Sequence, residues 1–469
     1  MPDRENLMNH AGSDDRKVPA RLDPALFAFW RSEGGGAPKR PWKFGWKAAI
    51  AVLALMAAAA AFGDWVFSFA IFNTGVLLPG DLTLTRPGPD VPPAIAAFAG
   101  IWAGDRWDGT VPHALVVERV GADGAADVIY ALGSDWASHE VHSYQRLHGE
   151  IVNGHLGFVL PNTHQRVDYS FAAGGRLLGR ATTPYGWRSY VLLKRIAAPD
   201  LATALAAARR RSDPLWQEIR IPEEARVGAA AGQRIELRAT LYRSPLPGRR
   251  PLIILNHSSP NDDDAKAGET LRFEDQARYL LALGYSVVVP MRKGRGGSGG
   301  PMEEAADLSD RPAPRLQLAS GLEDIDAAVD AMAARPDVDP ARIVVAGYGR
   351  GGLLSVAYAA RHPGKVAGAI NFSGGWWPAG DKRAALDAET FAAAGRSAAV
   401  PMLWLYADDD PDYPLSDVAR NFDAFRANGG RGLLFVIRDV RVRNIRVFFW
   451  TAKWEGVVRD YLRDVVGPG

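Results

Sequence analysis

The chain has no cysteine among its 469 residues. Thiol catalysis, disulfide bonds and cysteine-ligated metals are therefore excluded. Excess charge is lacking as well, because 55 basic and 53 acidic residues leave a net charge of +2. This balance gives no field that would favour nucleic acid, so we expect no nucleic-acid partner. The composition, 47% hydrophobic and 23% charged, is typical of a globular protein and not of a disordered or fibrous one.

Charge is almost absent from residues 47–72, where Asp64 is the only charged residue after Lys47. A bilayer core needs about 20 apolar residues, so we predict a single transmembrane helix here. The N-terminal side of this segment carries the basic residues Lys39, Arg40, Lys43 and Lys47. The next basic residue is Arg86. The asymmetry places the polar tail 1–46 in the cytoplasm and the C-terminal domains outside it, as in a periplasmic protein of a bacterial inner membrane. A cleaved signal peptide, which usually begins sooner, and a buried core helix are the alternatives.

Five prolines between Leu77 and Pro93 favour an extended linker over residues 73–96. In residues 97–196, apolar and polar residues alternate with a period near two, as in 127–132. Short alternating segments separated by glycine and asparagine turns predict a small antiparallel sandwich or barrel. The segment 100–104, Gly-Ile-Trp-Ala-Gly, resembles the entry strand of lipocalin-like β-domains.

Six of the nine histidines lie in this predicted β-domain: His113, His139, His142, His148, His155 and His164. Neutral imidazole is a common metal ligand, so a metal site is one interpretation. Their spacing matches no metal-binding motif, and we favour histidines on the surface and in turns. No metal and no cofactor are predicted.

A short connecting helix is expected within residues 197–215, and strands and helices alternate from residue 216 to 469. Apolar runs predict buried strands, and amphipathic stretches predict helices. The expected strands are 234–242, 251–256, 285–290, 342–347, 366–372, 401–406 and 432–437, and the expected helices are 273–283, 316–334 and 352–362. This alternation indicates an α/β domain, a mostly parallel sheet with helices on both faces.

Short motifs follow these strands in a characteristic order. They are His257-Ser258-Ser259-Pro260, the glycine-rich loop 292–300, Gly347-Tyr348-Gly349-Arg350-Gly351 and Tyr406-Ala407-Asp408-Asp409-Asp410. Their order resembles the α/β-hydrolase superfamily, and within it the dienelactone-hydrolase-like proteins. The resemblance implies an α/β-hydrolase fold, with an oxyanion loop, a nucleophile elbow and an acid loop at three of these motifs.

Two of the three triad positions that the resemblance implies cannot perform the chemistry. The elbow motif of the family is G-x-S-x-G, and Gly349 stands at its centre, without a side-chain atom that could attack a carbonyl. Asp410 takes the acid position, with Asp408 and Asp409 as alternatives. Arg446 falls where the family has its histidine, and an arginine stays protonated and cannot act as a general base. It could instead form an ion pair with Asp410.

The oxyanion region that the resemblance implies comprises His257, Ser258 and the backbone N–H of Arg350. Such a site, at a helix N-terminus, could still bind a small carboxylate or ester without cleaving it. We therefore expect a membrane-anchored pseudoenzyme that acts as a binding or interaction module, with a membrane protein as a candidate partner. The alternatives are an active ester or lactone hydrolase with a non-standard site, and a structural subunit of a membrane complex.

Three other features have both a functional and a plain interpretation. Asp262, Asp263 and Asp264 could replace the acid and base groups, but a solvated turn is favoured. The four arginines near the C-terminus favour a strand with a charged face: Arg438, Arg441, Arg443 and Arg446. The pair Trp376 and Trp377 could cover a substrate or pack in the core.

Overall fold

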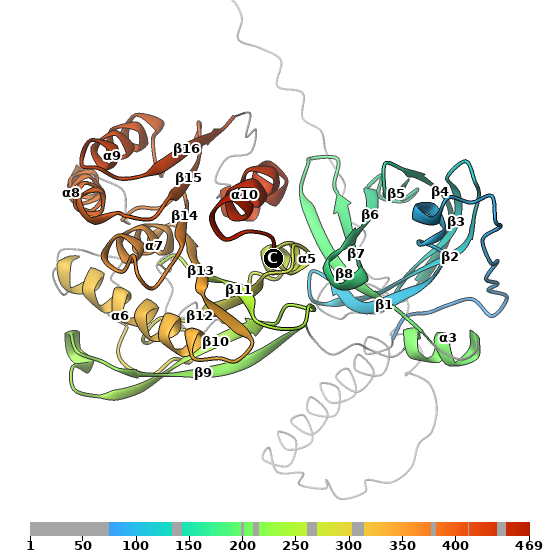
Figure 1. Cartoon of the computed structure of the whole chain (residues 1–469), viewed down its shortest axis with the longest axis horizontal. Coiled ribbons are helices and arrows are strands. Elements are labelled where there is room, and N and C mark those ends of the chain that lie inside the picture. The colour runs from blue at the N-terminus through green and yellow to red at the C-terminus, as the bar shows by residue number, and fades with distance from the viewer. Residues whose placement is uncertain are drawn as a thin grey trace, which may run out of the picture. The chain divides into compact units, whose positions relative to one another are not determined.

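The computed structural model describes residues 75–133, 143–197, 201–209, 215–259, 270–302, 314–376, 381–410, 412–438 and 447–469. These residues form an antiparallel barrel and a larger α/β sheet domain (Figure 1). None of their helices is long and apolar enough to cross a bilayer. The predicted membrane segment 47–72 and the predicted tail 1–46 lie outside the described residues.

The barrel is a closed sheet in which each strand pairs antiparallel with the next. Its strands are β1 (Gly100–Trp107), β2 (Val111–Val120), β3 (Ala125–Leu132), β4 (Ser143–Val152), β5 (His155–Val159), β6 (Arg166–Ala172), β7 (Arg176–Thr182) and β8 (Arg188–Arg195). The last strand closes on the first, with Trp102 opposite Arg195. The sequence predicted either a sandwich or a barrel, and the structure shows a closed barrel. Its β4–β5 turn places Asn153 and Gly154 at positive φ (51° and 77°), which suits a tight two-residue hairpin.

Aromatic side chains fill the core of the barrel around His113. The Nε2 atom of His113 lies 2.7 Å from the Tyr169 hydroxyl, and its Nδ1 atom lies 2.9 Å from the carbonyl oxygen of Ala131. Because a carbonyl only accepts, Nδ1 carries the hydrogen and Nε2 accepts from the tyrosine. Burial lowers the pKa of His113 to about 3. This histidine is therefore a neutral core residue.

The barrel histidines do not gather into a metal site in the part of the chain that the structure describes. His148 pairs with Asp127 at 2.8 Å, and His155 lies 3.9 Å from Asp168. Among the described residues, no three histidine, aspartate or glutamate side chains are placed to hold a metal ion. His139 and His142 lie outside the described residues.

The proline-rich segment expected to be a linker packs against the barrel instead. Val76, Leu78 and Leu82 are buried in a cluster with outward-facing barrel residues and with helix α3 (Leu201–Arg209). The Thr85 N–H also donates to the Glu118 carbonyl of β2 at 2.8 Å. The short helix α2 (Pro93–Ala96) then leads into β1. Proline has no N–H to donate to a neighbouring strand, and this segment forms no strand of the barrel. Its apolar residues nevertheless bury their surface against the barrel.

The second sheet has eight strands in the order β16-β15-β14-β13-β11-β12-β10-β9. They are β9 (Trp216–Glu224), β10 (Arg234–Tyr242), β11 (Arg250–Asn256), β12 (Ser286–Pro290), β13 (Val338–Tyr348), β14 (Gly368–Phe372), β15 (Met402–Ala407) and β16 (Gly432–Ile437). Strands β11 to β16 pair in parallel, and β10 pairs antiparallel with both β9 and β12. The predicted α/β fold with a mostly parallel sheet is confirmed.

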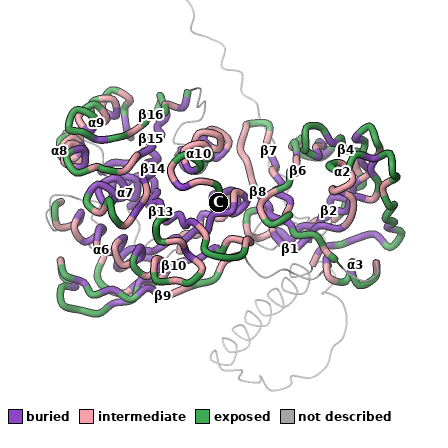
Figure 2. Tube along the Cα trace, viewed as in Figure 1, coloured by how far each residue is buried: buried purple, intermediate pink, exposed green. Residues whose placement is uncertain are grey.

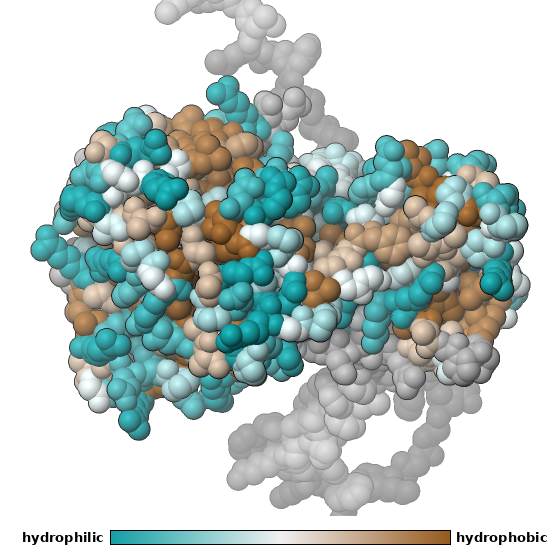
Figure 3. Space-filling view, in the orientation of Figure 1, coloured by the Kyte–Doolittle hydropathy of each residue, from teal (hydrophilic) through white to brown (hydrophobic). Residues whose placement is uncertain are grey.

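Helices cover both faces of this sheet (Figure 1). They are α5 (Glu274–Ala282), α6 (Pro314–Ala333), α7 (Arg350–Arg361), α8 (Asp381–Ser397), α9 (Leu415–Ala427) and α10 (Thr451–Val466). One core lies between the sheet and α6 to α9, and the other between the sheet and α5 and α10. The central strands are buried along their length, whereas the outer sides of the helices are exposed (Figure 2). On the face that Figure 3 shows, hydrophobic patches alternate with hydrophilic ones.

A buried ion pair connects strand β1 with helix α5. The Asp105 and Arg278 side chains are only 3% and 2% exposed, and Nε of Arg278 lies 2.9 Å from Oδ2 of Asp105. The same carboxylate accepts the Leu192 N–H at 2.6 Å, and Arg278 also pairs with Glu274 at 2.9 Å. Removing one partner of such a pair leaves an uncompensated charge in the interior.

We predict that Asp105→Leu or Arg278→Leu alone destabilises the protein by about 3–5 kcal/mol, because each leaves a buried charge unpaired. The double variant should cost clearly less than the sum of the two, since it removes both charges. Urea unfolding of the wild type and the three variants measures these differences. Additive costs in the double variant would show that the two charges do not depend on each other.

Candidate functional site

The candidate site centres on a sharp turn between β13 and α7. Gly349 forms this turn with φ 54° and ψ −126°, a backbone conformation that residues with a Cβ adopt only under strain. Its N–H donates to the Phe372 carbonyl at 3.1 Å, and its own carbonyl accepts from the N–H groups of Gly352, Leu353 and Gly375. The turn is thus anchored to the loop after β14 and to the first turn of α7. This is the strand–turn–helix geometry of a nucleophile elbow.

The neighbouring glycines are required by close packing. A Cβ at Gly347 would lie 2.6 Å from the Asn256 carbonyl oxygen, and one at Gly351 would meet the same oxygen. A Cβ at Gly352 would clash with the Asn371 side chain. Helix α7 therefore approaches β11 and β14 more closely than it could if residues with a Cβ stood at these three positions.

Gly349 differs from these glycines in what surrounds it. A Cβ built on Gly349 would lie 2.2 Å from Oγ of Ser258. The obstacle is a side-chain hydroxyl, and the Ser258 hydroxyl therefore occupies the space that a nucleophile at position 349 would need. The elbow backbone is retained, while the nucleophile is absent and its place is filled.

The loop after β11, predicted to be the oxyanion loop, lies directly beside this turn. His257 is fully buried, with Nδ1 2.7 Å from the Ser258 carbonyl oxygen and Nε2 accepting the Arg292 N–H at 3.1 Å. Both ring nitrogens are therefore engaged with the backbone. His257 holds the loop in place and is not available as a general base.

The glycine-rich loop after β12 clamps the oxyanion loop. The buried Arg292 guanidinium donates to the carbonyl oxygens of His257 (2.6 Å) and Ser258 (3.2 Å). Ser298 ties the far end of this loop to the sheet, because its hydroxyl donates to Met291 and accepts the Arg238 N–H. The arginine and the serine of the motif thus have structural roles that fix Ser258 against Gly349.

Arg350 contributes its backbone, and not its side chain, to the turn. It is the first residue of α7, and its buried guanidinium lies over the Trp376 ring at 4.1 Å and 3.4 Å from the Gln317 side-chain oxygen. The side chain is therefore directed towards α6 and the loop after β14. Trp376 is a core residue, one of the two interpretations of the tryptophan pair, and Trp377 lies outside the described residues.

Asp410 is the half-buried member of the acidic triplet after β15, while Asp408 and Asp409 are exposed. Its carboxylate accepts the N–H groups of Asp412 (2.9 Å) and Tyr413 (3.2 Å). Burial raises the pKa of Asp410, an effect that these N–H groups and the nearby Ser373 hydroxyl oppose. Strands β13, β14 and β15 are parallel neighbours, so their loops at Gly349, Ser373 and Asp410 lie at the same edge of the sheet.

In the described part of the chain, no histidine stands beyond β14, where the family order places the triad base. The last histidine of the sequence is His362, which follows the C-terminal end of α7 and stacks on Tyr358. A helix of that length puts it about 18 Å from the elbow. Arg446, predicted to replace the histidine, lies outside the described residues, so its predicted ion pair with Asp410 is not described either. The acidic residues 262–264 also lie outside the described residues. Of the four C-terminal arginines, only Arg438 is described, and it is exposed.

Sequence reasoning missed a buried polar cluster beneath the elbow. Asn371 donates to the Tyr406 hydroxyl at 3.0 Å, and that hydroxyl donates to the Gly374 carbonyl at 2.6 Å. Asp387 of α8 accepts the Trp376 N–H at 2.8 Å, and burial raises the pKa of Asp387 to about 7. These residues lie on three separate elements, and no local pattern signals that they meet.

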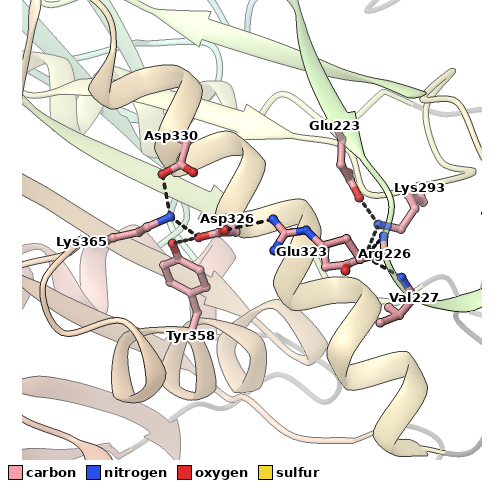
Figure 4. Close-up of polar contacts among 9 residues, drawn as sticks. All are labelled: Glu223, Arg226, Val227, Lys293, Glu323, Asp326, Asp330, Tyr358 and Lys365. Atoms are coloured by element: carbon pink, nitrogen blue, oxygen red, sulfur yellow. Dashed lines mark hydrogen bonds and ion pairs between the residues drawn. The ribbon is translucent and has the colours of Figure 1, made fainter. Parts of the chain in front are cut away.

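A second buried charge cluster surrounds Lys293 of the glycine-rich loop, and Figure 4 shows Lys293 with Glu223 and Glu323. The Lys293 ammonium group contacts Glu223 of β9 and Asp324 of α6, and lies 3.7 Å from Glu323. All but Glu323 are buried. Burial, together with the charge of Asp324, raises the pKa of Glu223 to about 8. The cluster joins the loop, an edge strand and a helix, but its carboxylates already have cationic or backbone partners.

Along α6, further carboxylates bind α7 and the segment after it (Figure 4). Asp326 accepts the Tyr358 hydroxyl and the Lys365 ammonium, both at 2.7 Å, and Lys365 also donates to Asp330. These contacts hold α7, and with it the elbow, against α6.

Comparisons with known proteins identify the family that this region resembles. Residues 267–435 match the model of the Dienelactone hydrolase family, which confirms the resemblance. A carboxymethylenebutenolidase homologue from Methylorubrum extorquens is 28% identical over 158 residues, which cover 33% of this chain. The matched region spans 52% of that relative's length.

Solved structures are similar to about half of the chain. An esterase of Pyrococcus furiosus shares 16% identity and a TM-score of 0.39, covering 54% of this chain and 91% of the esterase. A dienelactone hydrolase-like promiscuous phosphotriesterase from metagenomic libraries shares 16% identity and a TM-score of 0.38, covering 54% and 100%.

We predict that Gly349→Ala destabilises the protein by about 1–3 kcal/mol, because it adds backbone strain and a clash with Ser258. Adding Ser258→Gly should recover part of this cost, since it removes the clash but not the strain. Gly364→Ala is the matched control, because Gly364 has open space around it and should change stability little. Equal costs for Gly349→Ala with and without Ser258→Gly, measured by urea unfolding, would argue against the contact.

The Glu223 cluster predicts a pH dependence of stability. The pKa of Glu223 is about 8 in the folded protein and 4.5 in the unfolded chain. Glu223 therefore adds to the free energy of unfolding in full below pH 4.5, and this contribution is lost as the pH rises towards 8. Glu223→Gln should flatten this part of the profile of unfolding free energy against pH. Glu224→Gln, at the exposed neighbouring residue, is the control and should leave the slope unchanged. An unchanged slope in Glu223→Gln would mean that this carboxyl is ionised in the folded protein.

Proposed function

We propose that this chain, whose residues 267–435 form a dienelactone hydrolase family domain, has lost serine-hydrolase activity and binds a small carboxylate or ester at the elbow. The observation that carries the proposal is Gly349, which retains the strained turn of a nucleophile elbow but has no atom that could attack a carbonyl. Members of a catalytic triad act as a unit, so losing one abolishes most of the rate enhancement.

The chemistry that remains is suited to binding. Helix α7 starts at the turn, so its first N–H groups carry the positive end of the helix dipole. The Ser258 hydroxyl lies against the same turn and adds a hydrogen-bond donor. Donors that once stabilised a developing oxyanion also bind the negative oxygens of a carboxylate, without any step of bond cleavage.

The cellular setting is a further part of the proposal. The apolar segment 47–72, with four basic residues at or before its N-terminal end and none after it until Arg86, supports a single-pass anchor in the inner membrane with both folded domains in the periplasm. A ligand-binding protein held there would act as an interaction module, with a membrane protein as its candidate partner. Protease protection of spheroplasts, with a tag after residue 469, tests this orientation.

One observation favours a second candidate, an active ester or lactone hydrolase. Oγ of Ser258 occupies the space of the missing nucleophile, so this serine could attack a carbonyl bound at the same place. It would need a base, and Asp410, whose pKa burial raises, is the titratable group of the adjacent loop.

Ester hydrolysis by the purified full chain separates the two candidates. We expect no turnover above background on short aryl esters and lactones, and no covalent labelling by a fluorophosphonate probe, because neither a nucleophile at position 349 nor a histidine base is present. Ser258→Ala, Asp410→Ala and the matched control Ser259→Ala should then behave alike. Turnover or labelling that disappears in Ser258→Ala but persists in Ser259→Ala would establish the hydrolase instead.

Binding is tested in the same preparations. We expect benzoate to bind in a calorimetric titration and Ser258→Val to weaken it by about tenfold or more, because two methyl groups replace the hydroxyl at the elbow. The far-ultraviolet circular dichroism of the variant confirms that it folds. Unchanged affinity in a folded Ser258→Val variant would place the ligand elsewhere.

A further inference from the structure

A cavity of about 390 Å³ lies among helices α6, α7 and α8, away from the residues of the elbow turn. Its lining is mostly apolar and includes Leu318, Ala357, Trp376, Leu386, Ala393 and Ala394. This volume falls within the range of small-molecule sites, which are apolar clefts with a few polar groups that orient the ligand.

The charged groups at this cavity favour an anion. Arg315 and Glu389 line it and pair with each other at 3.1 Å, so their charges compensate. Arg361, at the end of α7, also lines the cavity and is exposed, and it forms no ion pair with any residue that the structure describes. Among the described residues, the cavity therefore combines apolar walls with one guanidinium group, that of Arg361, that has no ion-pair partner.

We propose that this cavity binds a small amphipathic monocarboxylate, with its apolar body between the helices and its carboxylate at Arg361. A guanidinium fork matches the geometry of a carboxylate and binds it through paired hydrogen bonds. A cationic amphiphile would be repelled by the same group, and a neutral one would gain only the burial of its apolar surface.

The site is separate from the elbow but shares one wall with the groups behind it. Trp376 lines the cavity, and its ring also carries the Arg350 guanidinium at 4.1 Å. A ligand that contacts Trp376 is thus separated from Arg350, the residue after Gly349, by the tryptophan ring. The inference goes beyond the proposed function and does not rest on it, because none of the lining residues belongs to the elbow turn or to the oxyanion loop.

Calorimetric titration of the full chain with octanoate, 1-octanol and octylamine tests the inference. We expect octanoate to bind more tightly than octanol, and octylamine to bind least. Arg361→Gln should weaken octanoate binding by about tenfold, and Arg361→Lys should restore part of it, because one charged hydrogen-bonded contact is removed and then partly replaced. Ala393→Leu, which narrows the cavity from a half-buried position, should weaken binding of both octanoate and octanol.

Two controls make the outcome specific to this cavity. Arg396→Gln removes an exposed arginine from α8 that does not line the cavity and should change nothing. Octanoate bound in this cavity should be lost in Arg361→Gln and kept in Ser258→Val, whereas octanoate bound at the elbow would show the reverse pattern, so failure at one site is distinguishable from failure at the other. The inference is overturned if octanoate does not bind, if octanol binds equally well, or if folded Arg361→Gln and Ala393→Leu variants keep the wild-type affinity.

Discussion

The backbone turn at Gly349 is the constraint on which the rest of the candidate site depends. The strand and the helix can meet at so sharp an angle because Gly349 adopts a positive φ, and because glycine at 347, 351 and 352 has no Cβ to clash with β11 and β14. Three hydrogen bonds from α7 and the β14 loop hold the Gly349 carbonyl in place. Glycine at the centre keeps this geometry at lower strain than serine would.

Buried charges hold the loops around that turn. Arg292 binds two carbonyl oxygens of the oxyanion loop, and Lys293 binds carboxylates of β9 and α6. Both residues come from one glycine-rich loop, so this loop acts as a scaffold for the turn. A scaffold of this kind keeps the N–H groups at the elbow organised, and it is preorganisation of such donors that gives a site its affinity for anions.

The sequence predicted the elements that depend on local pattern. Short apolar runs marked β11, β12 and β15, and the helical predictions at 273–283 and 316–334 agree with α5 and α6 to within two residues at each end. The edge strand β9 was missed because only two of its nine residues are buried, which leaves almost no apolar signal. The segment 73–96, predicted as an extended linker, packs Val76 and Leu82 against the barrel, a contact that its prolines do not indicate.

Sequence alone determined that Gly349 cannot be a nucleophile and that no histidine follows His362, since both statements depend only on which side chains are present. It also indicated the fold, through the order of motifs between parallel strands. Only the tertiary structure decided that Ser258 fills the nucleophile's space, that Asp105 meets Arg278, and that Arg361 faces an apolar cavity. Such pairs are brought together by the packing of elements far apart in the chain, and the periodicity of any one segment carries no information about its distant neighbours.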